Sequence, residues 1–502
     1  MLLGGSSSLD PWLLRHLRFD ELGLQSFYKY HVRNAGGVPT SDKIPVHFIL
    51  TSDEVAADAP AEGLETEAET KLPEVETLNS IPTHLLAAIY GSALPFTSAD
   101  EHLVVPLMHE RVPCGEVWRI AQSSFLRDLP RPHLSVLQAM LLCLHRTKED
   151  PKQHAVADTA ALWPLMGTMV GLAHNLGLHL ECRIMGIPAY EKRLRRRLWW
   201  AVYIEDKFYS LLAGRPPYIQ QGEWDVGQLD SADFVLRSDV EHPLPWHRMP
   251  FVHMANLALI ADSLQRSLYS LQSCQKLAED LTGSIQAART AFDALNTWRA
   301  NIPGLEHILE ETDVTRPALD NDPSSVQFAC LILVTYVWRA VLRPTVRSQP
   351  PPPILDVDQD EQPAEWTSLS LRDFGWDMAD LGDISLDLGD GGVEVHDDAT
   401  VIELYRGALA WAAGQMPRSR LSFVAASSFI AMLVVQAPCP ESARRGKDML
   451  DNWRRLLRDQ SRAFPMLGLS FSQLSEFYRV GLSTAFCLPL HVQEAVEGGG
   501  NG

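Results

Sequence analysis

The feature that most constrains the fold of this chain is a basic, tryptophan-bearing segment with helical periodicity. Residues 193–219 read RLRRRLWWAVYIEDKFYSLLAGRPPYI. Leu194, Leu198 and Val202 recur at the spacing of a buried helical face. A Gly-Arg-Pro sequence ends the pattern, because glycine and proline interrupt helices. The segment therefore predicts a long helix that lies in the core of a helical protein and carries charge on its other faces.

Helical patterns extend on both sides of this segment. A helix is predicted to begin near Trp163, with Pro164 in its first turn and Gly177 as its C-terminal stop. Other helical patterns cover 134–144, 250–277, 281–300, 323–342 and 401–482. We therefore expect an all-α protein, with one large multi-helix regulatory domain and two acidic disordered inserts.

The two inserts hold most of the formal net charge of −20. Residues 53–76 contain nine carboxylates and one lysine, and residues 355–398 contain fourteen carboxylates and one arginine. The rest of the chain is close to neutral, so net charge says little about what the folded body binds. In the second insert, Trp366, Phe374 and Trp376 stand among aspartates. This composition is typical of an activation segment that binds coactivators, and a solubilising loop is the alternative.

These observations divide the chain into five predicted parts. They are an extended or irregular N-terminal segment (1–51), an acidic linker (52–78), a regulatory domain (79–344), a Pro-rich and acidic disordered insert (345–400) and C-terminal helices that pack on the regulatory domain (401–490). Residues 46–50 read as a short strand or extended arm. The N-terminus lacks the pattern of a signal peptide, and no apolar run reaches the roughly 20 residues that cross a bilayer. We expect a soluble intracellular protein without membrane contact.

The cysteine and histidine positions do not indicate a metal site. The seven cysteines are at least 29 residues apart and form no Cys-x-x-Cys, so we expect buried thiols in a reducing compartment and no local zinc site. His174 and His179 are five residues apart, roughly 500° around an ideal helix. We therefore expect their rings to lie off a common face and to serve packing or capping.

Motifs of common enzymes are absent from the sequence. It contains no Gly-x-Ser-x-Gly, no phosphate-binding loop, no dinucleotide fingerprint and no His-Glu-x-x-His. Asp397 and Asp398 form the only Asp-Asp pair and lie beside the second insert, which argues against a helical lyase or cyclase. We expect no catalytic, cofactor-binding or metal-binding residue in this chain.

The dense basic cluster at 192–197 has three interpretations. Its arginines can form ion pairs with Glu191, Glu205 or Asp206, since these are close in sequence. It can also act as a nuclear import signal or contact nucleic acid. The buried-face spacing of the same segment favours ion pairing.

The order of motifs in residues 162–219 resembles the middle homology region of fungal zinc-cluster transcription factors, also called the fungal-specific or xylanolytic-activator regulatory domain. Members show a Trp and a Gly before a helix ending in Leu-Gly-Leu-His, then a charged run to Arg-Leu-Trp-Trp, then an acidic residue and Gly-Arg-Pro. The matching residues here are Trp163, Gly167, Leu176, Gly177, Leu178, His179, Arg196, Arg197, Trp199, Trp200, Asp206, Gly214, Arg215 and Pro216. The resemblance implies an all-α regulatory domain, in which these residues are structural.

One departure concerns the DNA reader of that family, an N-terminal cluster of six cysteines that holds two zinc ions. This sequence has no such cluster, so we expect either a chain truncated at its start or a protein that reaches promoters through a partner. Zinc is expected only if an upstream cysteine cluster exists. The implied partners are DNA, through that cluster or a partner factor, transcriptional coactivators, and a second copy or a related factor in a dimer.

The prediction from the sequence is therefore a nuclear regulator of RNA polymerase II transcription in a fungus. A helical scaffold or co-regulator without DNA binding is the alternative. An α-helical enzyme is a further alternative, which the missing motifs argue against.

Overall fold

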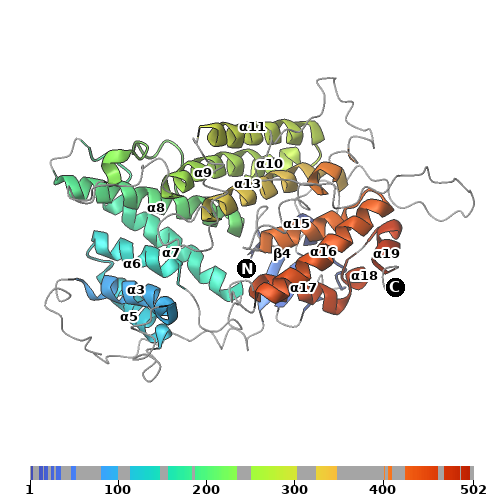
Figure 1. Cartoon of the computed structure of the whole chain (residues 1–502), viewed down its shortest axis with the longest axis horizontal. Helices are drawn as coiled ribbons and strands as arrows, with labels where there is room; N and C mark the ends of the chain where they lie inside the picture. Colours follow the sequence, from blue (N-terminus) through green and yellow to red (C-terminus); the bar gives the residue numbers. More distant parts are fainter. Residues whose placement is uncertain are drawn as a thin grey trace, which may run out of the picture. The chain divides into compact units, whose positions relative to one another are not determined.

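The computed structural model of the chain is built mainly from helices, and the all-α fold class is confirmed (Figure 1). The structure describes residues 2–3, 11–14, 16–20, 24–27, 30–34, 47–51, 81–99, 113–146, 156–183, 187–234, 250–301, 324–346, 401, 405–409, 424–461, 468–486 and 488–497. Both predicted acidic inserts lie outside these residues, apart from 345 and 346. Within them, no helix is long and apolar enough to cross a membrane.

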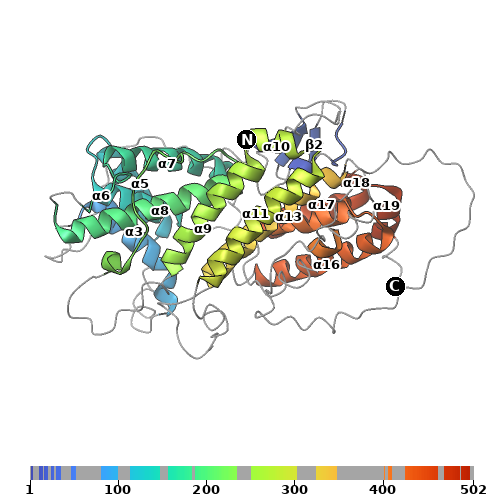
Figure 2. The same cartoon turned by 90° about the horizontal axis from the view of Figure 1, so that it is seen from above.

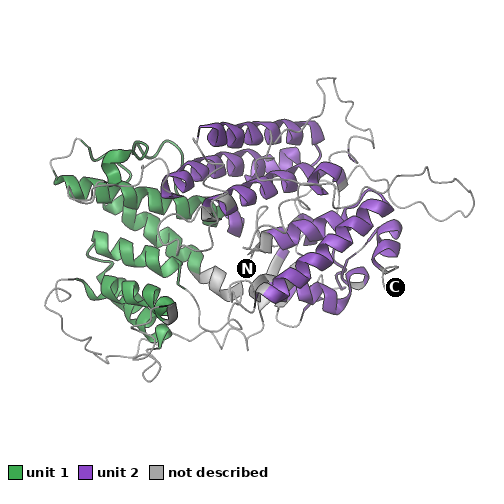
Figure 3. Ribbon diagram, viewed as in Figure 1, with its two compact units in different colours: residues 1, 51–210, 217–247 green, residues 2–50, 211–216, 248–502 purple. Residues whose placement is uncertain are grey.

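The chain forms two compact units (Figure 3). The first contains residues 51–210 and 217–247 together with Met1, and the second contains 2–50, 211–216 and 248–502. The helix predicted from the basic segment passes from one unit to the other at its last turn. The domain boundaries expected from the sequence stay a prediction.

The first unit is a stack of helices that ends with the basic segment. Its elements are α3 (Thr83–Ala93), η2 (Leu94–Ala99), α5 (Cys114–Asp128), α6 (Leu134–Leu144), α7 (Val156–Asn175), α8 (Ala189–Ala213) up to Ser210, and the short η4 (Ser231–Phe234). Helices α3, α5 and α6 pack against one another, and α6 also packs against α7. The predicted helix at 134–144 is confirmed.

A buried histidine links the first three helices of this unit. His84 is 4% exposed, and its Nδ1 lies 3.0 Å from Oδ2 of Asp128 while its Nε2 lies 2.9 Å from Oγ of Ser135. Both ring nitrogens are thereby satisfied, as a buried polar group requires. Nearby, a Cβ at Gly91 would come within 2.8 Å of the Trp118 ring. Glycine therefore permits the close approach of α3 and α5.

Helix α7 begins earlier than the sequence predicts. It starts at Val156, so Pro164 lies inside the helix and not in its first turn. The reason is the stretch VADTAAL before the proline, since alanine and leucine favour the helix. Proline removes a single backbone hydrogen bond there, and the helix continues to Asn175.

The N-terminal part of the second unit contains a small sheet. Its strands are β1 (Leu2–Leu3), β2 (Leu24–Ser26), β3 (Tyr30–Asn34) and β4 (His47–Thr51), in the order β1-β4-β3-β2, and the short α1 (Pro11–Leu14) follows β1. Strand β4 confirms the strand predicted at 46–50. Strands β1 and β2, of two and three residues, are too short to show an alternating pattern, and β3 was also not predicted. Leu24 pairs with Arg33 at one end of the antiparallel β2–β3 ladder.

Three helices of the second unit lie side by side (Figure 2). They are α9 (Pro250–Leu264), α11 (Leu281–Ala300) and α13 (Ser324–Leu342), and the predicted helices at 281–300 and 323–342 are confirmed. Asp280 caps α11, since its Oδ1 accepts the N–H of Gly283 at 2.7 Å.

The helix predicted over 250–277 is interrupted. A π-helical turn (Gln265–Tyr269) follows α9, and α10 (Leu271–Leu277) begins after Ser270. The hydroxyl of Ser270 accepts the N–H of Ser273 at 3.2 Å. This cap supports a new helix start within an apolar pattern that continues through it.

The remaining helices lie in the C-terminal part of the second unit. They are residues 405–409, α15 (Val424–Val435), α16 (Pro440–Gln460), α17 (Gly468–Val480), α18 (Leu482–Ala485) and α19 (Leu490–Glu497), with a 3-10 turn, η7 (Pro344–Val346), before them. Helix α16 packs against α15, α17 and α19. Nε1 of the buried Trp453 on α16 donates to Oγ of Ser427 on α15 at 3.0 Å. Helical structure after residue 400 is thus confirmed.

Candidate functional site

The basic segment forms α8, whose 25 residues make one continuous helix. Leu198 and Val202 are buried on one side of it, as their spacing predicts. Trp199 and Trp200 are also buried, with 0% and 2% of their surface exposed. The helix therefore belongs to the core of the first unit.

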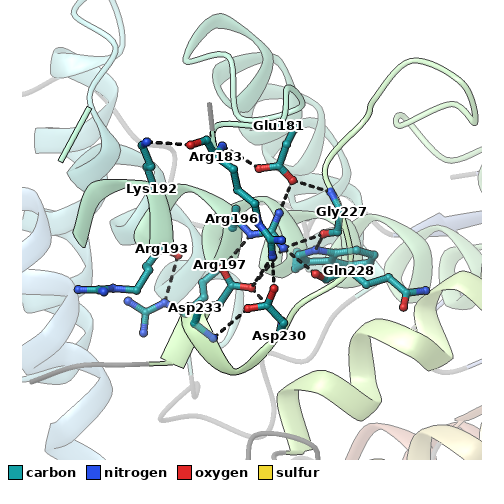
Figure 4. A network of polar contacts seen from close by, with 12 residues as sticks. Glu181, Arg183, Lys192, Arg193, Arg196, Arg197, Gly227, Gln228, Asp230 and Asp233 are labelled. Carbon is teal, nitrogen blue, oxygen red and sulfur yellow. Dashed lines mark hydrogen bonds and ion pairs between the residues drawn. The ribbon is translucent and has the colours of Figure 1, made fainter. Parts of the chain in front are cut away.

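Arg196 is the centre of a buried polar network on α8 (Figure 4). Only 2% of its side chain is exposed. Its Nε donates to Oδ1 of Asp233 at 2.8 Å and its Nη2 donates to Oδ2 at 3.2 Å. The guanidinium and the carboxylate therefore form a bidentate ion pair. Its Nη1 donates to Oε2 of Glu181. Two carboxylates thus surround one guanidinium.

The same guanidinium fixes the loop after residue 224. Nη2 of Arg196 donates to the carbonyl oxygens of Gln228 at 2.6 Å and Gly227 at 3.1 Å. The carbonyl of Gly227 also accepts from Nε1 of Trp200 at 3.1 Å, and its N–H donates to Glu181 at 2.9 Å. The network therefore ties α8 to two irregular segments.

The charges of this network stabilise one another. Burial opposes ionisation of Glu181, but the N–H groups of Gly227 and Arg183 and the charge of Arg196 hold its pKa below the ordinary value. Burial likewise opposes the charged form of Arg196, but Asp233 and then Glu181 raise its pKa. A buried arginine that is fully paired remains charged, and removal of one partner leaves the other uncompensated.

The other cations of the cluster divide into two groups. Nε of Arg195 lies 2.9 Å from Oε1 of Glu191, which is the pairing expected from the sequence, and its Nη1 donates to the carbonyl of Leu176 at 2.8 Å. Nζ of Lys192 donates to the carbonyl of Arg183 at 2.8 Å. Arg193 and Arg197 form no ion pair in the part of the chain that the structure describes.

The acidic residue of the motif, Asp206, holds the chain that follows α8. Its two oxygens accept the N–H groups of Tyr218 at 2.9 Å and Ile219 at 3.1 Å. Nζ of Lys207 lies 3.2 Å from Oδ2 of Asp206 and also donates to the carbonyl of Ile219. Both side chains are buried, at 0% and 1% exposure. This ion pair therefore closes the chain back onto α8.

The Leu-Gly-Leu-His motif follows the end of α7 and forms the turn that reverses the direction of the chain. Gly177 has φ of +67°, a left-handed conformation that favours glycine, so the predicted helix stop is confirmed. The turn brings the ring centroids of His174 and His179 to 4.8 Å, although we expected them apart. The expectation assumed an uninterrupted helix, and the helix ends between them at Asn175. Burial, and then the charge of His179, lower the pKa of His174.

Aromatic rings cover the face of α8 beside these histidines. The ring centroids of His174 and Trp199 are 6.0 Å apart. Trp224, in the loop fixed by Arg196, lies 6.0 Å from Trp199 and 5.7 Å from Trp200. Aromatic packing at these distances adds to the buried apolar area.

The Gly-Arg-Pro turn belongs to the second unit. Gly214 has φ of +64°, again left-handed, and its N–H donates to the carbonyl of Leu211 at 3.2 Å. The carbonyl of Arg215 accepts from Nε2 of Gln265 at 2.6 Å, and Gln265 begins the π-helical turn. Pro216 completes the turn. The motif residues are therefore divided between the two units.

The described cysteines do not fit a zinc cluster. Cys114, Cys182 and Cys274 are buried, and their thiols donate to backbone carbonyls at 3.4–3.6 Å. Burial, and then the charge of Glu181, raise the pKa of Cys182. Burial raises the pKa of Cys330 to about 12. Within the described residues, no three His, Cys, Asp or Glu side chains are placed to hold a metal ion.

Residues 74–300, which contain this network and both turns, match the family described as the fungal specific transcription factor domain. This part of the chain is similar to a fungal specific transcription factor domain. The resemblance seen in the motifs is confirmed by this match. No solved structure matches the chain.

The relatives of this domain are transcriptional regulators. An uncharacterized transcriptional regulatory protein of Schizosaccharomyces pombe is 24% identical over 53% of this chain and 36% of its own length. The transcriptional activator protein DAL81 of Saccharomyces cerevisiae is 34% identical over 31% of this chain and 15% of its own length. The cutinase transcription factor 1 beta of Fusarium vanettenii is 31% identical over 22% of this chain and 12% of its own length. The chain thus spans about a third or less of these relatives.

Sequence reasoning missed the partners of the central arginine in this domain. Glu181 and Asp233 bind Arg196, whereas Glu205 pairs with His145 and Asp206 with Lys207. The i, i+4 rule could find only Glu191 for Arg195, because the partners of Arg196 are 15 and 37 residues away. No local signal in the sequence marks them.

Proposed function

We propose that this chain is the regulatory part of a nuclear regulator of RNA polymerase II transcription in a fungus. The observation that carries the proposal is the coincidence of the matched family domain with the Arg196 network on α8. The names of the relatives support the same role. Direct DNA contact is assigned to a zinc cluster outside these residues or to a partner factor.

The mechanism that we propose is structural gating and not catalysis. Arg196 holds the loops at 181–183 and 227–233 against α8 through two carboxylates and two carbonyls. Its N–H donors are therefore directed to protein groups, and no pair of them is left to bind a substrate. A signal that weakens one of these contacts would release both loops together, since they share one guanidinium.

The acidic segment 355–398 lies outside the described residues, and its part in the function rests on composition. We propose that its aromatic and leucine side chains bind coactivators, while its aspartates keep the segment solvated. Deletion of 355–398 is expected to reduce activation. Replacement of its aromatic residues by alanine, with the charge intact, is expected to have the same effect.

The experiment is a reporter assay with the full chain fused to a foreign DNA-binding domain in a fungal host. We expect reporter expression to change relative to the DNA-binding domain alone. We expect Arg196→Met to alter that output, and the exposed Arg119→Met on α5 to leave it unchanged. Equal reporter expression with and without the chain would overturn the proposal.

A helical scaffold without promoter contact is the second candidate. The observation that favours it is that Lys192, Arg195 and Arg196 direct their donors to carbonyls and carboxylates of the chain itself. Chromatin mapping of the tagged protein in its host separates the two. Promoter enrichment supports the regulator, and a protein that binds partners but shows no promoter enrichment supports the scaffold.

A further inference from the structure

One stripe of α8 carries three side chains outside the buried network. Tyr190 and Arg197 are seven residues apart, which places them about 20° from each other around the helix, and Arg193 lies about 40° from Arg197. Tyr190 is 66% exposed, and the two arginines are half-buried. Figure 4 shows the Arg193 side chain directed away from the cluster around Arg196. The stripe therefore faces outward from the network.

The charges of this stripe are not neutralised by the described part of the chain. Lys192, Arg195 and Arg196 each donate to a carbonyl or a carboxylate. In contrast, Arg197 donates only to the backbone carbonyl of Arg193, at 3.4 Å, and the Arg193 guanidinium has no hydrogen bond among the described residues. The two unpaired cations are thus neighbours.

The arrangement costs free energy in the absence of an anion. Like charges at i and i+4 of a helix destabilise the helix. Burial, and then the charge of Arg193, lower the pKa of Arg197, while Asp233 acts in the opposite direction. A partly desolvated guanidinium gains most from a carboxylate or phosphate that accepts its planar pair of N–H groups. The stripe is therefore suited to an external anion.

We propose that Tyr190, Arg193 and Arg197 form a docking surface for an acidic peptide of a partner protein. Side chains at i and i+4 have Cβ atoms about 5–6 Å apart. Alternate residues of an extended peptide are about 6.6 Å apart, so two acidic side chains on one face match the two arginines. An apolar side chain of the same peptide packs against the exposed ring of Tyr190.

Charge complementarity favours a peptide over nucleic acid. A phosphate backbone is bound by several cations along its path. Here the adjacent cations are engaged, and the carboxylates of Glu191 and Asp233 lie on the same and the next element. A short acidic peptide needs only the two arginines. This proposal is independent of the reporter activity, since it concerns the purified chain.

The test uses fluorescence anisotropy with the full chain and a labelled synthetic peptide in which glutamate alternates with alanine and tryptophan. We expect saturable binding that weakens as salt rises, because surface charge pairs are screened. The variant R193E/R197E is expected to lose about tenfold or more in affinity, since charged hydrogen bonds contribute about 1.5–3 kcal/mol. R193K/R197K is expected to retain part of the affinity for the peptide. Tyr190→Ser is expected to bind the peptide several-fold more weakly than the parent chain.

Matched controls separate docking from folding. Arg119→Glu reverses an exposed arginine on α5 and is expected to bind like the parent chain. A peptide with glutamine in place of glutamate is expected not to bind. Hydrogen exchange of the 227–233 loop reports whether R193E/R197E keeps the fold; if it does not, R193K/R197K and Tyr190→Ser decide the question.

Three results would overturn the proposal. The first is peptide binding that is equal in the parent chain and in the variants of the stripe. The second is the absence of peptide binding. The third is stronger, stripe-dependent binding of inorganic phosphate or of duplex DNA, which would assign the arginines to phosphate recognition.

Discussion

The guanidinium of Arg196 and the carboxylate of Asp233 form two parallel hydrogen bonds across a sequence separation of 37 residues. Both side chains are almost fully buried, at 2% and 4% exposure. A second carboxylate, Glu181, accepts from the other side of the guanidinium, and Nη2 of Arg183 lies 3.8 Å from Oδ2 of Asp233. Arg196 therefore contacts both loops beside α8, which are also joined to each other by the hydrogen bond from the N–H of Glu181 to Asp225 and by the ion pair of Arg183 with Asp230.

Replacement of Arg196 by methionine should release these loops. The aliphatic stem is kept, but Glu181 and Asp233 lose the charge of Arg196, and Asp233 keeps only Arg183 at 3.8 Å. Breaking a buried ion pair costs about 3–5 kcal/mol. We expect faster hydrogen exchange at the N–H groups of Gly227 and Asp230, which donate to Glu181 and Asp233. Hydrogen exchange of the full chain measures this.

The control for this change is Arg195→Met on the same helix. Arg195 is less buried, and its pair with Glu191 lies within one helix. We expect a loss of only about 0.3–0.5 kcal/mol from that ion pair, with little change in the 227–233 loop. Equal exchange in the Arg196 variant and the parent chain would contradict the central role of Arg196.

The fold was predictable where periodicity is local, and the site was predictable only in part. Apolar residues at helical spacing, with Pro or Gly at the helix ends, predicted α8, α11 and α13, although α13 is buried on all sides from Ile332 to Leu342. Spacing could not predict Asp233, because the loop that carries it has no periodicity. The turn at Gln265 was missed because the apolar helical pattern continues through it, and β1 and β2 were missed because they are only two and three residues long. The contact between His174 and His179 was missed because one glycine reverses the chain between them.

Asp206 and Lys207 should show strong coupling. Both are buried, and Asp206 also accepts the N–H groups of Tyr218 and Ile219. Asp206→Asn keeps an acceptor but removes the buried charge that lies 3.2 Å from Nζ of Lys207, and we expect a loss of about 3–5 kcal/mol. The double variant Asp206→Asn/Lys207→Met should lose less than the sum of the single variants. Urea unfolding of all four chains measures the coupling, and additive losses would show that the pair does not interact.

The pair formed by His145 and Glu205 should make stability depend on pH. Nε2 of His145 lies 2.9 Å from Oε1 of Glu205, and this hydrogen bond, together with the charge of Glu205, raises the pKa of His145. A raised folded-state pKa means that the contribution is complete below the unfolded value of about 6.5 and is lost as pH rises through the folded value. His145 is exposed, so we expect about 0.2–1 kcal/mol. Thermal unfolding between pH 5.5 and 8 measures it.

The matched variant for this pH dependence is Glu205→Gln, which keeps a hydrogen-bond acceptor and removes the charge. The fall in melting temperature on going from pH 5.5 to 8 should be smaller in this variant than in the parent chain. High salt should also reduce the fall, because the pair is near the surface. An identical pH profile in both chains would assign the dependence to other groups.

Two glycines on α7 should respond in opposite directions to alanine. A Cβ at Gly167 would lie 2.8 Å from the ring of Tyr218, which stacks on Trp163 with centroids 4.5 Å apart. The ring must shift, and overpacking of this kind costs about 1–3 kcal/mol. A Cβ at Gly171 meets no atom within 4 Å, so alanine there should stabilise the helix by about 0.5–1 kcal/mol. Urea unfolding of Gly167→Ala and Gly171→Ala distinguishes close packing from helix propensity, since a gain at both sites would show that Tyr218 does not restrict position 167.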